Sequence, residues 1–152
     1  MPLRDVDRRA VGIAALLAAA IVFVHVSTST GTVTAAATNT LVMAVGIAAV
    51  PAGVVVGVLS GSYDRHLIEG GFAAAGGTAM GILGWSVVSA ISLDGVPIAH
   101  RLDVVFVVVA LEGPVFAVVA PCLFLVGGYT AARVAEWNRR SIDDRLTIGL
   151  FR

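Results

Sequence analysis

The sequence predicts an all-α integral membrane protein with four transmembrane helices and both termini in the cytoplasm. Of its 152 residues, 58% are hydrophobic and only 13% are charged, about half the charged share of an average soluble domain. The mean hydropathy is +0.95, which leaves too little polar surface to cover a soluble globule. Three long stretches, 10–63, 70–93 and 104–132, contain no Asp, Glu, Lys or Arg except Glu112.

The apolar stretches divide into four spans that are separated by short polar segments. A helix needs about 20 apolar residues to cross a hydrocarbon layer about 30 Å thick, so the stretch 10–63 holds two spans and a connection. Eight of the fourteen residues in 27–40 are Ser or Thr, which makes this segment the predicted connection. Asp94, Gly95 and Pro97 mark a turn after the third span. The expected spans are 10–26, 41–60, 67–93 and 104–132, followed by a tail over 133–152, within one membrane domain over 1–152.

The distribution of arginines predicts the orientation in the membrane. With the N-terminus inside, nine arginines fall in inner segments and only Arg101 falls outside. The positive-inside rule then places both termini of a multi-pass cell-membrane protein in the cytoplasm. The arginine-rich start could also belong to a signal peptide, but its apolar segment is longer than a usual signal core. An uncleaved first span is therefore the preferred interpretation.

The tail over 133–152 is expected to be a helix at the membrane surface. Its apolar residues recur on one side of a helix, with Arg and Asp elsewhere, and Trp137 would anchor it at the headgroups. A helix that docks on a partner protein has the same pattern and stays open as the alternative. The apolar positions are Val134, Trp137, Ile142, Leu146 and Leu150.

Glycines repeat at matching intervals in the second and third spans, and each set stays near one line on its helix. Small residues let helix backbones approach closely, which favours packing in lipid. We therefore expect spans two and three to pack on each other through these faces. Contact between copies of the chain and a backbone-lined pore are the alternatives. The expected helix-packing residues are Gly46, Gly53, Gly57, Gly70, Gly77, Gly81 and Gly84.

Glu112 is the only formally charged residue well inside an expected span. Gly113 and Pro114 follow it directly, and a proline leaves a helix carbonyl without its donor. A buried carboxylate beside such a carbonyl could bind a proton or a small cation. A hydrogen bond to a neighbouring Ser, Thr or carbonyl would instead give it a structural role. The span-facing polar residues that could partner it are Asn39, Thr78, Ser86 and Ser89.

Other kinds of chemistry have little support in the sequence. A net charge of zero leaves no basic excess for nucleic acid. Cys122 has no second cysteine to pair with and is expected to be a buried, inert thiol. We expect His25 and His100 to be solvated near the outer surface and His66 to lie in an inner turn, and their spacing matches no metal-ligand motif. No cofactor, metal or catalytic residue is assigned, and the chain is not expected to be an enzyme.

The stretch 53–84, GVVVGVLSGSYDRHLIEGGFAAAGGTAMGILG, resembles a family of small haloarchaeal membrane proteins of unknown function. In that family a glycine-spaced helix, a short polar turn and a second glycine-rich helix follow one another, so the resemblance implies a helix pair and no catalytic residues. The leading hypothesis is a non-enzymatic four-helix membrane protein that associates with itself or with a larger membrane complex. The alternative is a small transporter or channel in which Glu112 binds a proton or cation.

Overall fold

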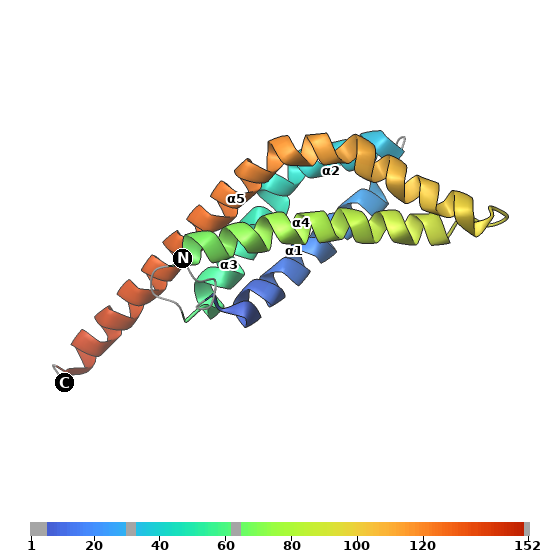
Figure 1. Cartoon of the computed structure of the whole chain (residues 1–152). Helices are drawn as coiled ribbons and strands as arrows, with labels where there is room; N and C mark the ends of the chain where they lie inside the picture. Colours follow the sequence, from blue (N-terminus) through green and yellow to red (C-terminus); the bar gives the residue numbers. More distant parts are fainter. Residues whose placement is uncertain (1–5, 30–32, 62–64, 151–152) are drawn as a thin grey trace.

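The computed structural model describes residues 6–29, 33–61 and 65–150, and the side chains of all of these except 33–34 and 142–150. Helices account for nearly all of the described chain, and they pack into an elongated bundle (Figure 1). The helices are α1 (Arg8–Thr28), α2 (Val33–Ile47), α3 (Ala49–Leu59), α4 (His66–Ile91) and α5 (Ile98–Leu150).

Four apolar helical segments in the described chain are long enough to cross a membrane. α2 and α3 together supply one, Ala35–Leu59, and the others are Arg8–Thr28, His66–Ile91 and Ile98–Ser141. Even the shortest has 21 residues and therefore reaches about 30 Å at a rise of about 1.5 Å per residue. The predicted all-α class and the predicted number of potential spans are confirmed for this part of the chain.

α2 begins eight residues before the predicted start of the second span at residue 41. Most of the Ser/Thr-rich segment is therefore helical. Alanines favour this conformation, and Ala36 and Ala37 are buried in a cluster with Val26 of α1. Hydroxyl groups also need not interrupt a helix, because they can donate to a carbonyl one turn earlier. Ser27 does so at the end of α1, where its hydroxyl lies 2.7 Å from the carbonyl of Phe23.

A break at Ala48 separates α2 from α3. The backbone of Ala48 has φ −113° and ψ −42°, although its amide still donates to the carbonyl of Ala44 at 3.0 Å. Pro51 follows three residues later and has no N–H group, so the carbonyl of Ile47 lacks its helical donor. The two helices consequently form one bent span rather than two.

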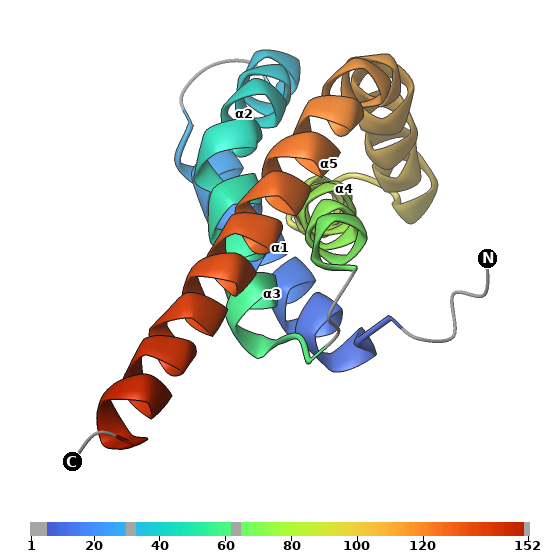
Figure 2. The ribbon, with the colours of Figure 1, turned by 90° about the vertical axis from the view of Figure 1, so that its left-hand side faces the viewer.

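α5 is far longer than a membrane crossing requires. Its 53 residues include Pro114 and Pro121, and the helix bends in its middle (Figure 1). The predicted tail is a continuation of this helix, and it projects beyond the rest of the bundle (Figure 2). Trp137, the expected membrane anchor, is exposed there. The remaining apolar positions of the predicted tail face, Ile142, Leu146 and Leu150, lie outside the described side chains.

A tight turn joins α4 to α5 at the predicted position. Gly95 has φ 76°, in the left-handed region that favours glycine. Arg101 closes this turn from the first part of α5. Its Nε donates to the carbonyl of Val96 at 2.8 Å, and its Nη1 donates to the carbonyl of Ile91 at 2.9 Å. The second bond satisfies one of the carbonyls that the end of α4 would otherwise leave unpaired.

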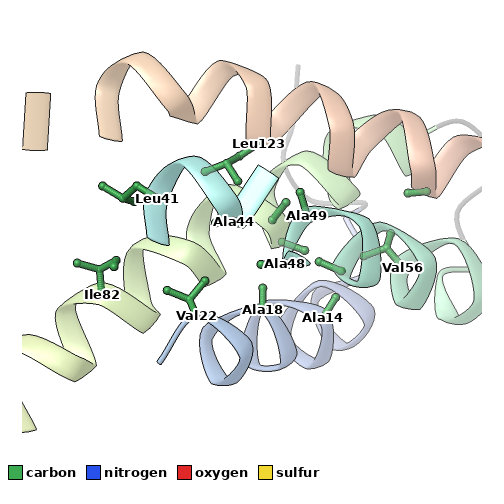
Figure 3. Packing of buried hydrophobic residues seen from close by; sticks show 14 of the residues in the cluster. Ala14, Ala18, Val22, Leu41, Ala44, Ala48, Ala49, Val56, Ile82 and Leu123 are labelled. Carbon is green, nitrogen blue, oxygen red and sulfur yellow. The ribbon is translucent and has the colours of Figure 1, made fainter. Parts of the chain in front are cut away.

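The core between the helices is made mainly of small side chains. Nine of the fifteen residues in the principal buried cluster are alanines, so the helix axes can approach closely. Figure 3 shows Ala14, Ala18 and Val22 of α1 facing Ala48 and Ala49 across this core. The buried residues of α1 recur at every fourth position, which confines its contact with the bundle to one narrow stripe.

Polar residues from several helix ends meet at one end of the bundle. The backbone amide of Asp7, just before α1, and the hydroxyl of Ser60, just after α3, both donate to Glu69 in the first turn of α4. The part of α5 that passes this end contains Ala135 and Arg139, which line a cavity together with Ser60. The arginines of these segments are Arg8, Arg9, Arg65, Arg133, Arg139 and Arg140.

Candidate functional site

Glu112 of α5 is buried against α2, with 4% of its surface exposed. The hydroxyl of Thr38 lies 3.0 Å from each of its carboxyl oxygens and donates to them. This hydrogen bond joins two helices that are 74 residues apart in the sequence. Pro114 follows two residues later and cannot donate to the carbonyl of Ala110, so that carbonyl lacks its helical partner.

The partner of Glu112 differs from the residues expected from the sequence. Thr38 was missed because the sequence placed it in a connection rather than in a helix. Among the expected partners, Asn39 is exposed, and Ser86 donates instead to the carbonyl of Leu83 at 2.8 Å. Thr78 is fully buried, and its hydroxyl has no hydrogen-bond partner among the described residues. Starting the helix at the alanine run before Thr38 would have brought this hydroxyl into the second span.

A cavity of about 170 Å³ lies beside Glu112, between α2, α4 and α5, and its surface is almost entirely apolar. Apart from Glu112, the side chains around it are apolar. Buried and exposed residues both contribute, so the cavity reaches from the core to the molecular surface. Its walls are formed by Leu41, Ala79, Ile82, Leu83, Val108, Val109, Glu112, Gly113 and Phe116.

Glu69 is a second buried acid, and it lies at the start of the expected span 67–93. It is fully buried in the first turn of α4. Its Oε1 accepts from the backbone amide of Asp7 at 2.8 Å, and its Oε2 accepts from Ser60 at 2.5 Å. Glu112 is therefore not the only buried acid of the described chain, although Glu69 lies in the first turn of its span and not well inside it. An acid in the first turn of a helix is favoured by the helix dipole, and this signal could have placed Glu69 on α4.

Asp7 connects the same cluster to the start of α1. Its Oδ1 accepts from the amides of Arg9 and Ala10 at 3.1 Å each, as an N-cap residue does. The hydrogen bond from Ala10, helped by the amides of Gly61 and Arg9, holds the pKa of Asp7 below its ordinary value. Asp7 and Glu69 therefore tie the first turn of α1 to that of α4.

The glycines of the second span lie against α5. A Cβ atom added at Gly53 would lie 2.4 Å from the carbonyl oxygen of Gly127. One added at Gly57 would lie 2.6 Å from that of Ala131. Contacts below 3.0 Å with backbone atoms leave no room for a side chain. Gly46, in contrast, has open space where a Cβ would be.

The glycines of the third span lie against two other helices. A Cβ at Gly77 or Gly81 would meet the backbone of α1, at 2.4 Å from the Ala15 oxygen and 2.7 Å from the Ala19 oxygen. A Cβ at Gly70 would lie 2.5 Å from the oxygen of Gly127 in α5, whereas Gly84 faces open space.

The close neighbours of the two glycine sets therefore come from α1 and α5, and not from each other as expected. The small residues can be read from the sequence, but the helix that faces each of them cannot. Gly127 and Gly128 of α5 were missed, although two consecutive glycines within an apolar stretch are a visible signal. A Cβ at Gly128 would lie 2.3 Å from the oxygen of Leu67.

The remaining reactive side chains do not assemble into a metal site. Within the described residues, no group of three His, Cys, Asp or Glu side chains could hold a metal ion. Cys122 is exposed and not buried as expected, because Leu123 takes the inward position of that turn. His66 is buried at the start of α4. His25 is only half-exposed, and its Nε2 is buried, so the expectation of a solvated ring is wrong for His25. His100 is exposed, as expected.

Comparison with protein-family models, with curated proteins and with solved structures finds no match to this chain.

Proposed function

We propose that this chain is a non-enzymatic integral membrane protein that works by associating with a second copy of itself or with a larger membrane complex. The observation that carries the proposal is the poor coverage of the most apolar part of the fourth span. Only 11% of that 18-residue stretch is buried within the chain, against 28%, 44% and 39% for the corresponding stretches of the other three. Membrane helices are held in place mainly by packing against other helices, so a stretch with so little packing is suited to a partner, while the rest of α5 packs on α3 and α4.

The exposed side of α5 supplies large apolar residues for such a contact. Phe106, Val118 and Leu125 are between 62% and 76% exposed, and they cover about 19 residues of helix, or about 28 Å at about 1.5 Å per residue. The contact would therefore extend across most of a bilayer about 30 Å thick. We propose that both termini of the assembled protein face the cytoplasm, because the arginines gather at the end of the bundle where α1 begins.

The mass of the protein purified in a mild detergent tests this proposal. We expect a particle that contains at least two copies of the chain or a co-purifying membrane protein. Val118→Trp should dissociate it by placing a large ring on the contact surface. Leu16→Trp on α1, where the native side chain is 63% exposed, is the matched control and should leave the mass unchanged. A monomeric mass for the unmodified protein, with nothing co-purifying, would contradict the proposal.

A second candidate function is proton or cation exchange at Glu112. The observation that favours it is a buried carboxyl whose single hydrogen-bond donor in the described chain is Thr38. Glu112→Gln keeps the size of the side chain but cannot titrate, so a flux of protons or sodium ions into reconstituted vesicles should disappear with this variant. Equal flux through both proteins would assign Glu112 a structural role.

A further inference from the structure

A second cavity, of about 160 Å³, lies at the end of the bundle where α3 ends and α4 begins. Ser60 follows the last residue of α3, His66 is the first residue of α4, and both line this cavity. Asn138 and Arg139 line it from α5, which passes here and continues beyond the bundle (Figure 2). Unlike the cavity beside Glu112, this one exposes polar and apolar atoms in similar amounts. Polar groups of a ligand can therefore meet polar groups of the chain here.

The ends of two potential spans place this cavity at the level of the lipid headgroups. The second potential span ends at Leu59 and the third begins at His66. The third has 26 residues and reaches about 39 Å at about 1.5 Å per residue, which is more than the hydrocarbon layer of about 30 Å. Its first residue can therefore lie outside the hydrocarbon, among the headgroups. Val58 supplies apolar surface to the same cavity from the last turn of α3.

The side chains around the cavity that can carry a charge are basic. Arg139 is permanently positive, His66 becomes positive when its ring is protonated, and none of the described side chains that line the cavity is acidic. Glu136 precedes Arg139 by three residues, but it accepts instead from Arg133 and Arg140. The cavity therefore favours a ligand with negative charge.

The polar groups around the cavity supply mainly hydrogen-bond donors for such a ligand. The Arg139 guanidinium has five N–H groups and the Asn138 amide has two. Ser60 donates its proton to Glu69, so the donors that face a ligand come from Arg139, Asn138 and the His66 ring. Arginine binds phosphate through two parallel hydrogen bonds, and the start of a long helix such as α4 adds partial positive charge.

We propose that this cavity binds an anionic phosphate group, which accepts hydrogen bonds from Arg139 and Asn138 of α5 and from His66 of α4. A phosphate has fewer heavy atoms than benzene, which fits into a protein cavity of about 150 Å³, so a cavity of about 160 Å³ is large enough. The phosphate can belong to a membrane lipid or be free in solution. Such a site does not depend on the association of the chain with a second copy or a larger complex.

Isothermal titration calorimetry on the full-length protein in a neutral detergent tests the proposal. We expect dihexanoyl phosphatidic acid to bind saturably, and at least about tenfold more tightly than dihexanoylglycerol, which lacks the phosphate, because hydrogen bonds to a charged group contribute at least that much. Inorganic phosphate is the third probe. Phosphate that binds as tightly as phosphatidic acid assigns the site to free phosphate, and weaker binding assigns it to a lipid headgroup. Equal binding of phosphatidic acid and dihexanoylglycerol, or no saturable binding of either phosphate probe, would overturn the proposal.

Two neighbouring arginines provide a matched pair of variants. Arg139→Gln should weaken the binding of the phosphate probes at least about tenfold. Arg140→Gln removes the same charge from the next residue, whose side chain is 73% exposed and pairs with Glu136 outside the cavity. Its effect should stay within about twofold, because exposed charges are screened by salt. Equal losses in both variants would overturn the proposal and leave only a general attraction of anions to a basic surface.

Asn138→Leu tests the cavity without changing the charge of the protein. This exposed side chain keeps its size but loses its amide donors, so the variant should fold and bind the phosphate probes more weakly. Thermal unfolding in detergent checks that each variant remains folded. An Asn138→Leu protein that is folded and binds phosphatidic acid with unchanged affinity would place the phosphate outside this cavity and contradict the proposal.

Discussion

At the scale of single residues, the buried polar groups divide into those with partners and those without. The Thr38 hydroxyl donates a hydrogen bond to Glu112, whereas the Thr78 hydroxyl is buried without a partner among the described residues. A buried donor or acceptor that loses its partner costs about 1–3 kcal/mol, while removing a group that has none costs little. The two threonines are therefore a matched pair for measuring what the Glu112 contact contributes.

Thr38→Val should lower the free energy of unfolding by about 1–3 kcal/mol, because it leaves the Glu112 carboxyl without a donor. Thr78→Val should be neutral or slightly stabilising. Glu112→Gln should be close to neutral, since an amide can still accept from Thr38, and Glu112→Ala should cost about as much as Thr38→Val. Thermal unfolding in detergent measures all four variants. Equal losses for the two threonine variants would show that the Glu112 contact does not contribute to stability.

Glycine positions with and without space give a second comparison at the same scale. A methyl group at Gly77 would lie 2.4 Å from a backbone oxygen of α1, and one at Gly84 would meet nothing. Gly77→Ala should therefore push α4 away from α1 and cost at least about 1–3 kcal/mol, as overpacking does. Gly84→Ala should gain up to about 1 kcal/mol from helix propensity. Melting temperatures that fall by the same amount in both variants would refute this account.

At the scale of elements, hydropathy was enough to count the potential spans but not to place the ends of the helices. Three apolar stretches divided into four potential spans, because the length needed to cross a bilayer is fixed. The start of α2 was missed, since a segment rich in Ser and Thr scores as a loop even when its alanines are buried. Glu112 was found as a lone charge, but its partner Thr38 lay in the misassigned segment. Contacts between helices, such as that of Gly53 with α5, depend on tertiary packing that no local pattern encodes.

The cap of α1 gives a pH dependence that belongs to this scale. The pKa of Asp7 is lowered in the folded protein, from an ordinary value of 3.8, chiefly by the Ala10 amide. A carboxyl of this kind stabilises the fold above its unfolded pKa and loses that contribution as the pH falls through the lower, folded pKa. The free energy of unfolding should therefore decline below about pH 4. Asp7→Asn should reduce this decline. Denaturation of both proteins between about pH 3 and 6, a range that includes the ordinary pKa of Asp, would measure the free energy of unfolding of each.

At the scale of the whole molecule, the chain brings most of its arginines to one end of a four-span bundle. Arg101 lies at the opposite end, beside the turn at Gly95. Reporter fusions after Trp137 should be active in the cytoplasm, and fusions in the turn at residues 94–97 should be active outside. A fusion at Ser29, directly after α1, should also report the exterior. An external signal after Trp137 would show that the orientation or the number of crossings is wrong.

The close contact at Gly127 of α5 limits how far the spans can slide past one another. The carbonyl oxygen of Gly127 lies 2.4 Å from the position of a Cβ at Gly53 and 2.5 Å from that of a Cβ at Gly70, so three helices meet closely here. The free energy of an apolar helix in lipid changes little when the helix shifts along the membrane normal, because the hydrocarbon layer is apolar throughout. Moving α5 by one turn, about 5.4 Å, would bring Leu123 or Ala131 to this junction in place of glycine. The close packing at Gly127 therefore sets the register of three spans along the membrane normal, which hydrophobicity alone would not determine.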